Sequence, residues 1–407
     1  MSHLCDILIV GGGVLGASIA FHLAQRRPGR VMLVEKAYLG AGASGKSAAL
    51  VYQSHPDALT TALARRCLPV FEHFADVVGG PPVFWRTGVV RLLPRGDEAE
   101  LESQLARQRE LGIDVRRIAD HELMEVDPNA RLADDEVAAF EPAAGYVEGV
   151  QAVASFAEAA RREGADIRQG VEVRALLADK GKISGVETNE GTYECARLVL
   201  ATGAWAAQLP RTLKIELPVR AGRAQVALFR RPVESGRRGV VFADLVQGLY
   251  LRPGQGDLIH AGDLAESPAE PPVDPEACSE AADADWLPAV RQRLIRRYPA
   301  MHCGFGRGGY GMPAARTTDG RPILDRLPEL EGAFCAAGFG GANFLLAPLV
   351  GQVMAQWLVE DTADDLDLTP FRLARFAESE PAPVAEAAES VPGATGTNRG
   401  GGDASSD

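Results

Sequence analysis

The stretch DILIVGGGVLGASIAFHLAQ, residues 6–25, decides the fold of this chain. Its apolar run, glycine cluster and second apolar run predict a buried strand, a tight turn and a helix. Gly11, Gly13 and Gly16 occupy the G-x-G-x-x-G positions. At these positions glycines allow a tight turn, close approach of a pyrophosphate and close packing of helix on strand.

A second strand, VMLVEK at residues 31–36, completes the unit and ends on the acid Glu35. Glu35 lies about 20 residues after the glycines, where a carboxylate accepts hydrogen bonds from a ribose diol. The N-terminus of the intervening helix offers free N–H groups and a positive dipole end to phosphates. Strand, turn, helix, strand and acid in register predict a dinucleotide site.

Composition limits the class of protein. The 407 residues are enough for two domains, and 46% of them are hydrophobic, which supports a large core. A net charge of −13 argues against nucleic acid as a partner, because nucleic acid requires clustered cations. The six cysteines form no C-x-x-C pair, which disfavours a metal site or a dithiol centre and indicates reduced thiols.

Targeting signals are missing from the sequence as we read it. No charged N-terminal segment precedes an apolar run with a cleavage site, and the motif begins at the sixth residue. We expect no apolar run to reach the length needed to cross a bilayer, and the longest candidates, such as LVLATGAW at residues 198–205, are broken by glycine. We therefore expect no membrane span and a cytoplasmic location.

Two kinds of segment alternate along the chain. Residues 1–80, 150–217 and 310–376 read as parts of one nucleotide-binding domain of α/β type. Residues 81–149 and 218–309 read as a second, mostly antiparallel α+β domain inserted in two pieces.

The C-terminal tail, residues 378–407, is rich in Ala, Glu, Pro, Ser and Gly. It contains almost no large apolar residues with which to form a core. We expect this tail to be disordered.

In this order, the motifs resemble those of the superfamily of FAD-dependent D-amino acid oxidases, sarcosine oxidases and glycine oxidases. The stretches that carry the resemblance are the opening turn with VEK, GAGASGKSAA (40–49), EPAAGYVEGVQAVASFAEAARREGA (141–165), LVLATGAWA (198–206) and GMPAARTTDGRPILDRLPELEGAFCAAGFGGANFLLAPLVG (311–351). The resemblance covers nearly all of the chain up to about residue 376. It implies a discontinuous Rossmann-like FAD-binding domain with an inserted substrate-binding domain, and FAD rather than NAD.

The resemblance assigns residues to the cofactor. Gly11, Gly13, Gly16 and Glu35 would hold the ADP half of FAD, and Lys36 would either lie against the adenine or be exposed. The remaining implied cofactor residues are Ser44 and Lys46 in the loop beside the flavin, Val173 by its backbone at the adenine, and Thr202 and Gly203 close to the cofactor.

A second glycine-rich loop returns near the C-terminus and leads into a helix expected from about Leu345 to Glu360. A helix N-terminus aimed at flavin N1 and C2=O would stabilise negative charge on the reduced ring. The residues implied in this role are Gly338, Gly340, Gly341, Ala342, Asn343, Phe344 and Leu345.

Three positions depart from the family pattern. Leu345 stands where sarcosine-oxidase-like relatives often carry a lysine that activates oxygen. This favours a dehydrogenase that passes electrons to a quinone or a flavoprotein, with O2 as the alternative acceptor. The position of a cysteine that attaches FAD in some relatives falls near Met312, with no cysteine close, so we expect non-covalent FAD. Ala314 occupies the place of an arginine in glycine-oxidase-like relatives.

The substrate carboxylate needs an arginine, whose planar fork matches it bidentately. Arg316 is one candidate, and Arg252 with Tyr250 is the other, because a strand places residues two apart on one face. His55 and His260 are candidates for the pocket wall, although a single histidine is more often structural.

We expect an FAD-dependent oxidoreductase that oxidises the C–N bond of a small amino acid or secondary amine by hydride transfer to flavin N5. The substrates considered are a D-amino acid, sarcosine, glycine or a proline-like compound. Two alternatives remain: a 2-hydroxy acid dehydrogenase of the same superfamily, and a flavoprotein subunit or assembly factor whose FAD is structural.

Overall fold

Strand β1 (His3–Val10) lies at the centre of the first sheet of the computed structural model, which describes residues 3–235, 239–264, 271–363 and 366–378. It pairs in parallel with β2 on one side and β12 on the other, as the first motif predicts. The other strands of this sheet are β2 (Val31–Glu35), β9 (Asp166–Gln169), β10 (Val173–Asp179), β11 (Lys182–Thr188), β12 (Gly191–Leu200), β18 (Ile323–Arg326) and β19 (Ala333–Ala337).

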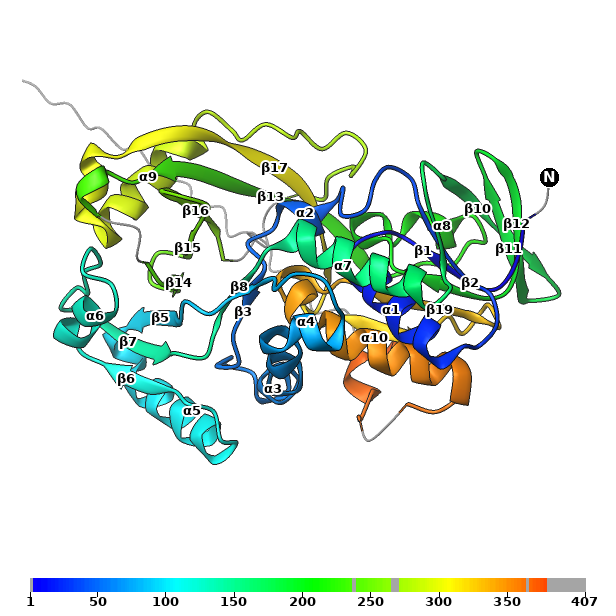
Figure 1. Cartoon of the computed structure of the whole chain (residues 1–407), viewed down its shortest axis with the longest axis horizontal. Helices are drawn as coiled ribbons and strands as arrows, with labels where there is room; N and C mark the ends of the chain where they lie inside the picture. The colour runs from blue at the N-terminus through cyan, green and yellow to red at the C-terminus, as the bar shows by residue number, and fades with distance from the viewer. Residues whose placement is uncertain (1–2, 236–238, 265–270, 364–365, 379–407) are drawn as a thin grey trace, which may run out of the picture.

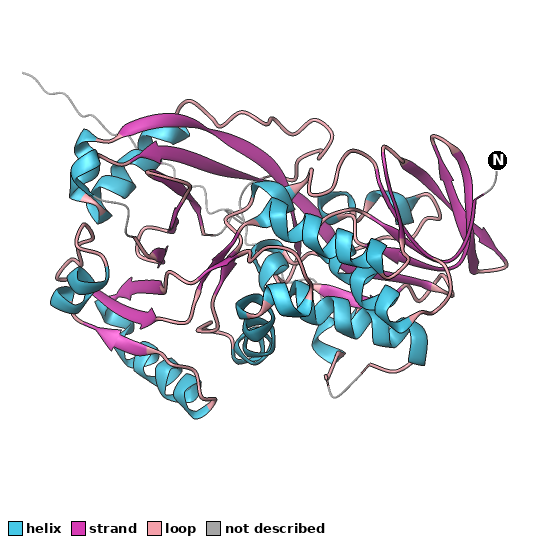
Figure 2. Ribbon diagram, viewed as in Figure 1, coloured by secondary structure: helices cyan, strands magenta, loops and turns pink. Residues whose placement is uncertain are grey.

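The central strand is buried on both faces. Ile7 and Ile9 join the core beneath the helices, whereas Leu8 and Val10 join the core on the opposite face. This alternation follows from the two-residue period of a strand. The helices on the first face, gathered over the sheet in Figure 2, are α1 (Val14–Arg26), α3 (Ala58–Glu72), α4 (Phe74–Val77), α7 (Gly149–Arg162) and α10 (Asn343–Glu360).

Helix α10 contains a longer apolar stretch than we expected. Gly340–Glu360 is long and apolar enough to cross a membrane by length and composition, so our expectation that no run reaches this length is wrong. The segment is 78% buried inside the protein and packs against α1 and α3. A helix that is apolar on all sides is typical of a buried core position as well as of a membrane span.

The second sheet is antiparallel except for the parallel pair β14–β5. In spatial order its strands are β17 (Phe305–Thr317), β13 (Val219–Arg230), β16 (Leu258–Asp263), β15 (Leu249–Pro253), β14 (Val241–Asp244), β5 (Val89–Pro94), β7 (Glu136–Glu141) and β6 (Arg116–Ile118). The helices beside it are α5 (Glu98–Glu110), α6 (Asp120–Val126) and α9 (Trp286–Arg297). Buried Arg297 of α9 bridges Glu136 of β7 and Asp244 of β14, at 2.8 Å each.

A small sheet joins the two parts. Its strands are β3 (Leu50–Val51), β8 (Gly145–Val147) and β4 (Phe84–Trp85). The remaining helices are α2 (Ala43–Lys46), α8 (Gln208–Arg211) and α11 (Arg375–Glu378), with 3-10 turns at Arg95–Asp97, Gly203–Trp205, Val233–Ser235, Pro299–Cys303, Gly340–Ala342 and Thr369–Phe371.

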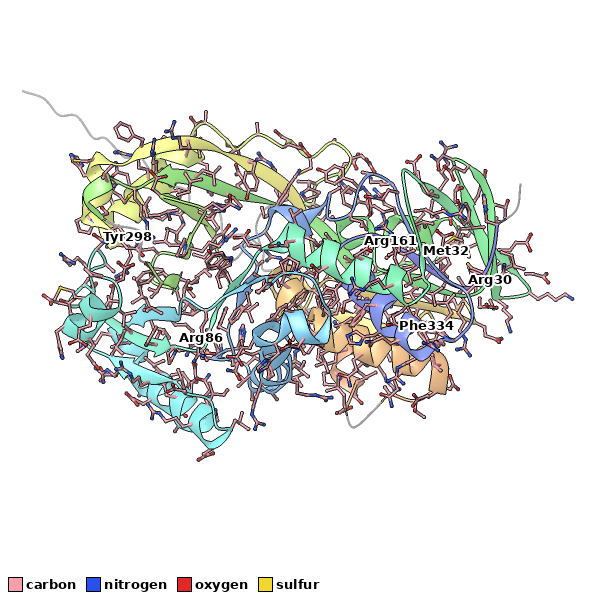
Figure 3. All side chains as sticks on the ribbon, viewed as in Figure 1. Arg30, Met32, Arg86, Arg161, Tyr298 and Phe334 are labelled. Carbon is pink, nitrogen blue, oxygen red and sulfur yellow. The ribbon has the colours of Figure 1, made fainter. Side chains whose placement is uncertain are left out.

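The molecule is elongated, with the first sheet at one end and the second sheet at the other (Figure 1). Figure 3 shows Tyr298, in the core of the second sheet, far from Met32 and Phe334 in the cores of the first. Strand β17 begins at Phe305 and pairs with β13 through Thr317, so it crosses the domain boundary that we placed at residue 310. The tail expected to be disordered lies, beyond Glu378, outside the described residues.

Candidate active site

The turn after β1 depends on two glycines. Gly11 has a φ of +111°, and a Cβ added there would lie 2.4 Å from the carbonyl oxygen of Ala201. A Cβ on Gly16 would lie 1.9 Å from the carbonyl oxygen of Gly11. Glycine at these positions therefore allows α1 to pack against the turn and the turn to pack against the end of β12.

The loop that contains α2 folds onto the start of α1. The N–H of Val14 donates to Ser44 Oγ at 3.0 Å. A Cβ on Gly13 would approach the same oxygen to 3.1 Å. Because α2 is held there, Ser44 lies at the positive end of α1, where an anion is stabilised.

Glu35 is fixed by the backbone. Its Oε2 accepts a hydrogen bond from the N–H of Gly12 at 2.7 Å, and its Oε1 accepts one from Ala37 at 2.9 Å. Each carboxylate oxygen has a second lone pair. The carboxylate is thus held at the end of β2 with acceptor capacity left for a diol.

These groups surround a cavity of about 370 Å³, within the size range of cofactor sites. It brings together residues from seven separate stretches of the chain, within 10–15, 34–44, 171–173, 201–209, 276–280, 313–315 and 336–343. Of the predicted cofactor residues, those that line it are Gly11, Gly13, Glu35, Lys36, Ser44, Val173, Thr202, Gly203, Gly338 and Asn343.

The cavity has the features that FAD needs. Thr202 Oγ1 is buried without a hydrogen-bond partner in the described part of the chain, although Thr202 lines the cavity. A Cβ on Gly203, which lines the cavity, would meet no atom within 4 Å. Open space at the glycine loops, the end of α1 and a fixed acid is the arrangement that an extended dinucleotide requires.

The other predicted cofactor residues lie outside the lining. Gly16 packs helix on turn, and Lys46 pairs with Glu280 at 2.5 Å. Phe344 and Leu345, in the first turn of α10, are each 1% exposed and belong to the core beneath the helices. The rest of this group, Gly340, Gly341 and Ala342, forms the 3-10 turn before α10.

Arg252 of β15 lies in a buried polar cluster next to the loop that contains α2 and Ser44. Its guanidinium lies 4.5 Å from the centre of the Tyr146 ring and 4.0 Å from the carboxylate of Glu148. Glu148 caps α7, and a Cβ on the adjacent Gly149 would lie 2.5 Å from the carbonyl oxygen of Ser44. The cluster therefore borders the loop assigned to the flavin.

Three buried polar atoms in this cluster have no hydrogen-bond partner among the described residues: Tyr250 Oη, Arg252 Nε and His260 Nδ1. Arg252 and His260 are cross-strand partners of β15 and β16, and Tyr250 shares the face of Arg252. Burial, helped by Arg252, lowers the pKa of His260 to about 4, and burial raises the pKa of Tyr250. At neutral pH this site therefore presents a cation and two neutral polar groups.

His55 is not among the residues that line the cavity. Its ring stacks on Tyr52, with 4.1 Å between centroids, and its Nε2 lies 3.0 Å from the carbonyl oxygen of Tyr52. Burial, and then Arg91, lowers its pKa to about 4. These contacts hold the His55 ring against Tyr52 of the same loop, and its place in the pocket wall stays a prediction.

Arg316 lies on β17 opposite Arg220, and its backbone bridges to Phe339. Pro313 and Ala315 of the same strand line the cavity, so strand alternation directs the side chain of Arg316 to the other face. Of the two predicted arginines, Arg252 is therefore the one that lies with Tyr146 and Glu148 next to the loop of α2.

Sequence reasoning missed many of the residues that line the cavity, among them the polar or aromatic residues Tyr38, Glu172, Trp205, Gln208, Glu276 and Glu280. Trp205 follows the recognised ATG turn and could have been found from it. Glu276 and Glu280 belong to an acidic, proline-rich stretch without a motif, and nothing in their pattern points to the cavity.

Comparison with known proteins agrees with this geometry. Glycine oxidase from Geobacillus kaustophilus (strain HTA426) is 30% identical over 386 residues, which cover 92% of this chain and 98% of that protein. Peroxisomal sarcosine oxidase from Homo sapiens is 29% identical over 92% of this chain and 96% of its own length. The crystal structure of L-proline dehydrogenase from P. horikoshii, 24% identical, superimposes over 93% of this chain and 99% of its own with a TM-score of 0.83.

The predicted α/β fold is confirmed by this structural match. Residues 6–357 match the family described as "DAO: FAD dependent oxidoreductase", which confirms the resemblance found in the sequence. The chain therefore belongs to the DAO family of FAD-dependent oxidoreductases.

Proposed function

We propose that this protein oxidises the C–N bond of a small amino acid or secondary amine to an imine, which water then hydrolyses. The substrates that fit are a D-amino acid, sarcosine, glycine or a proline-like compound. The names of the relatives, glycine oxidase and sarcosine oxidase, support this class of substrate.

The observation that carries the proposal is the buried polar cluster around Arg252. Arg252 is 6% exposed, and among the described residues neither its Nε nor the hydroxyl of Tyr250, on the same face of β15, has a hydrogen-bond partner, which suits a carboxylate. Glu148, 4.0 Å away, offsets part of the arginine's charge before substrate binds. We assign the substrate carboxylate to Arg252 and Tyr250.

The remaining residues orient the amine. His260 is neutral because its pKa is about 4, so its ring can accept a hydrogen bond from the substrate N–H. FAD, when bound, supplies the acceptor for the hydride that leaves the substrate carbon. The substrate amine loses its proton to solvent before this step, and the residues of the cluster hold it in the orientation required.

We also propose that FAD is bound non-covalently. None of the residues that line the cavity in the described part of the chain is a cysteine. The family resemblance puts the attachment position near Met312, and β17, which contains Met312, has no cysteine. Cys303, which precedes β17, is exposed.

Anaerobic mixing of the purified FAD protein with a substrate panel tests the function. The panel contains sarcosine, glycine, proline, D-alanine and 2-hydroxyglutarate, and the readout is loss of the oxidised flavin absorbance. Bleaching by an amine or amino acid supports the proposal. Bleaching only by the hydroxy acid favours the dehydrogenase alternative, and no bleaching by any member favours a structural role for FAD.

A further inference from the structure

A segment of the substrate half of the chain lies across the cofactor cavity. It comprises residues 273–283, between β16 and α9, and we refer to it as the strap. Glu276 and Glu280 of the strap line the cavity together with residues of the FAD-binding part.

The base of the strap is fixed to the second sheet. The N–H of Val273 donates to the carbonyl oxygen of Ala221 at 2.8 Å, and the N–H of Gly311 donates to that of Glu280 at 2.8 Å. Arg223 pairs with Asp283 at 2.7 Å. These contacts hold the strap on β13 and β17.

The outer side of the strap is held by two lysines of the other part. Glu276 pairs with Lys36 at 2.5 Å and accepts a hydrogen bond from Trp205 Nε1 at 2.6 Å. Lys36 also lies 4.0 Å from the centre of the Trp205 ring. Glu280 pairs with Lys46 at 2.5 Å.

The two lysines that pair with the strap lie at opposite ends of one loop that borders the cavity. Lys36 follows β2 and Lys46 ends α2, so they mark the two ends of the loop between these elements. Ala37, Tyr38 and Gly42 of this loop line the cavity. The strap therefore spans the rim of the cavity from one end of the loop to the other.

The strength of these contacts is moderate. The side chains of Glu276 and Glu280 are 58% and 79% exposed, and those of Lys36 and Lys46 are 35% and 20% exposed. Exposed ion pairs are weak individually and are screened by salt. Such contacts hold a segment closed and still release it reversibly.

We infer that the strap closes the cofactor cavity through the pairs Glu276–Lys36 and Glu280–Lys46, and that its opening sets the rate at which FAD enters and leaves. The inference depends on FAD as the cofactor and not on the proposed substrate.

The test compares FAD exchange in the wild type and in the double variant E276Q/E280Q. FAD release from the diluted holoprotein is followed by the rise in flavin fluorescence, and FAD uptake by the apoprotein is followed by its loss. We expect both rates to increase about fivefold or more in the variant, because the strap opens more often, and the wild-type release rate to rise between about 20 mM and 500 mM NaCl.

A simple charge effect predicts the opposite sign for release. Removing two negative charges near a diphosphate strengthens the binding of FAD and slows its release. If FAD leaves E276Q/E280Q at the wild-type rate or more slowly, the proposal that the strap closes the cavity is wrong.

Two further variants complete the design. E331Q removes the same charge from an exposed pair with Lys182, outside the cavity lining, and we expect wild-type exchange. D283N weakens the base of the strap at Arg223 without altering a cavity-lining residue, and we expect faster exchange in both directions. If the protein does not bind FAD, both the cofactor assignment and the proposed role of the strap are wrong. If FAD exchanges but no substrate is turned over, only the proposed function is contradicted.

Discussion

Arg252 and His260 lie directly opposite each other on the antiparallel strands β15 and β16, and each carries a buried nitrogen without a partner in the described part of the chain. A cation next to a neutral imidazole is costly to bury unless a ligand completes its hydrogen bonds. In the proposed function, this pair is where the substrate carboxylate and amine are held.

Replacing Arg252 with Gln should raise the KM for the carboxylate substrate about 10- to 100-fold, because a charge-assisted pair is worth about 1.5–3 kcal/mol. The FAD dissociation constant should stay within about twofold of the wild type, since Arg252 lies outside the cofactor cavity lining. Steady-state kinetics and FAD titration measure the two quantities.

The matched control for Arg252 is Arg174→Gln, which removes an exposed arginine paired with Glu172. The carboxamide analogue of the substrate adds a second check. It should react poorly with the wild type and equally poorly with R252Q. If R252Q still prefers the carboxylate over the carboxamide, the assignment of the substrate carboxylate to Arg252 is wrong.

Glu35→Gln should weaken FAD binding about tenfold, which corresponds to about 1.4 kcal/mol. Both carboxylate oxygens accept backbone N–H bonds, and an amide can satisfy only one of them while its NH2 group opposes the other. Fluorescence titration of the apoprotein measures the change. Glu172→Gln, at another acid that lines the cavity, should bind FAD as the wild type does, and equal weakening of both variants would contradict the assignment.

Stability should fall between about pH 6.5 and pH 4 because of buried histidines. Burial lowers the pKa of His22, His55 and His260 to about 4 from the ordinary value near 6.5. In this interval the unfolded chain binds more protons than the folded chain, so the free energy of unfolding decreases as the pH falls.

The His22→Asn variant isolates one of these contributions. We expect its unfolding free energy to depend less steeply on pH than that of the wild type, by about 1–3 kcal/mol between pH 6.5 and pH 4. The exposed His302→Asn serves as the control, and urea titrations at several pH values provide the measurement. An unchanged slope in His22→Asn would show that His22 does not titrate in this way.

The reduced protein should react slowly with O2 and rapidly with a quinone-like dye. A leucine at residue 345, buried in the core, supplies no positive charge to favour a superoxide-like intermediate. Stopped-flow mixing of the substrate-reduced protein with air-saturated buffer or with the dye gives both rates. Fast reoxidation by air would identify O2 as the acceptor and show that this inference from Leu345 is wrong.

Much of the fold could be predicted from local sequence. The strand–turn–helix–strand unit and the helix of residues 343–360 follow from apolar periodicity and from glycines whose conformations the backbone requires. The end of the cavity at Gly11 and Glu35 was predictable for the same reason, because both residues belong to one continuous motif.

The rest depends on contacts between distant segments. Arg252 and Arg316 could not be ranked from sequence, because the face on which each side chain lies is set by pairing with β16 and with β13. The strap has no motif. Its carboxylates pair with Lys36 and Lys46, which are more than two hundred residues away in the sequence. The length of the apolar stretch in α10 was missed, and composition alone does not distinguish a core helix from a membrane span.

The most direct test of the account is the spectrum of the purified protein before and after removal of its cofactor. We expect a yellow protein that releases FAD into the supernatant on acid precipitation, and an apoprotein that takes up one equivalent of FAD again. A colourless protein that stays colourless in excess FAD would contradict the cofactor assignment, and a precipitate that stays yellow would contradict non-covalent binding.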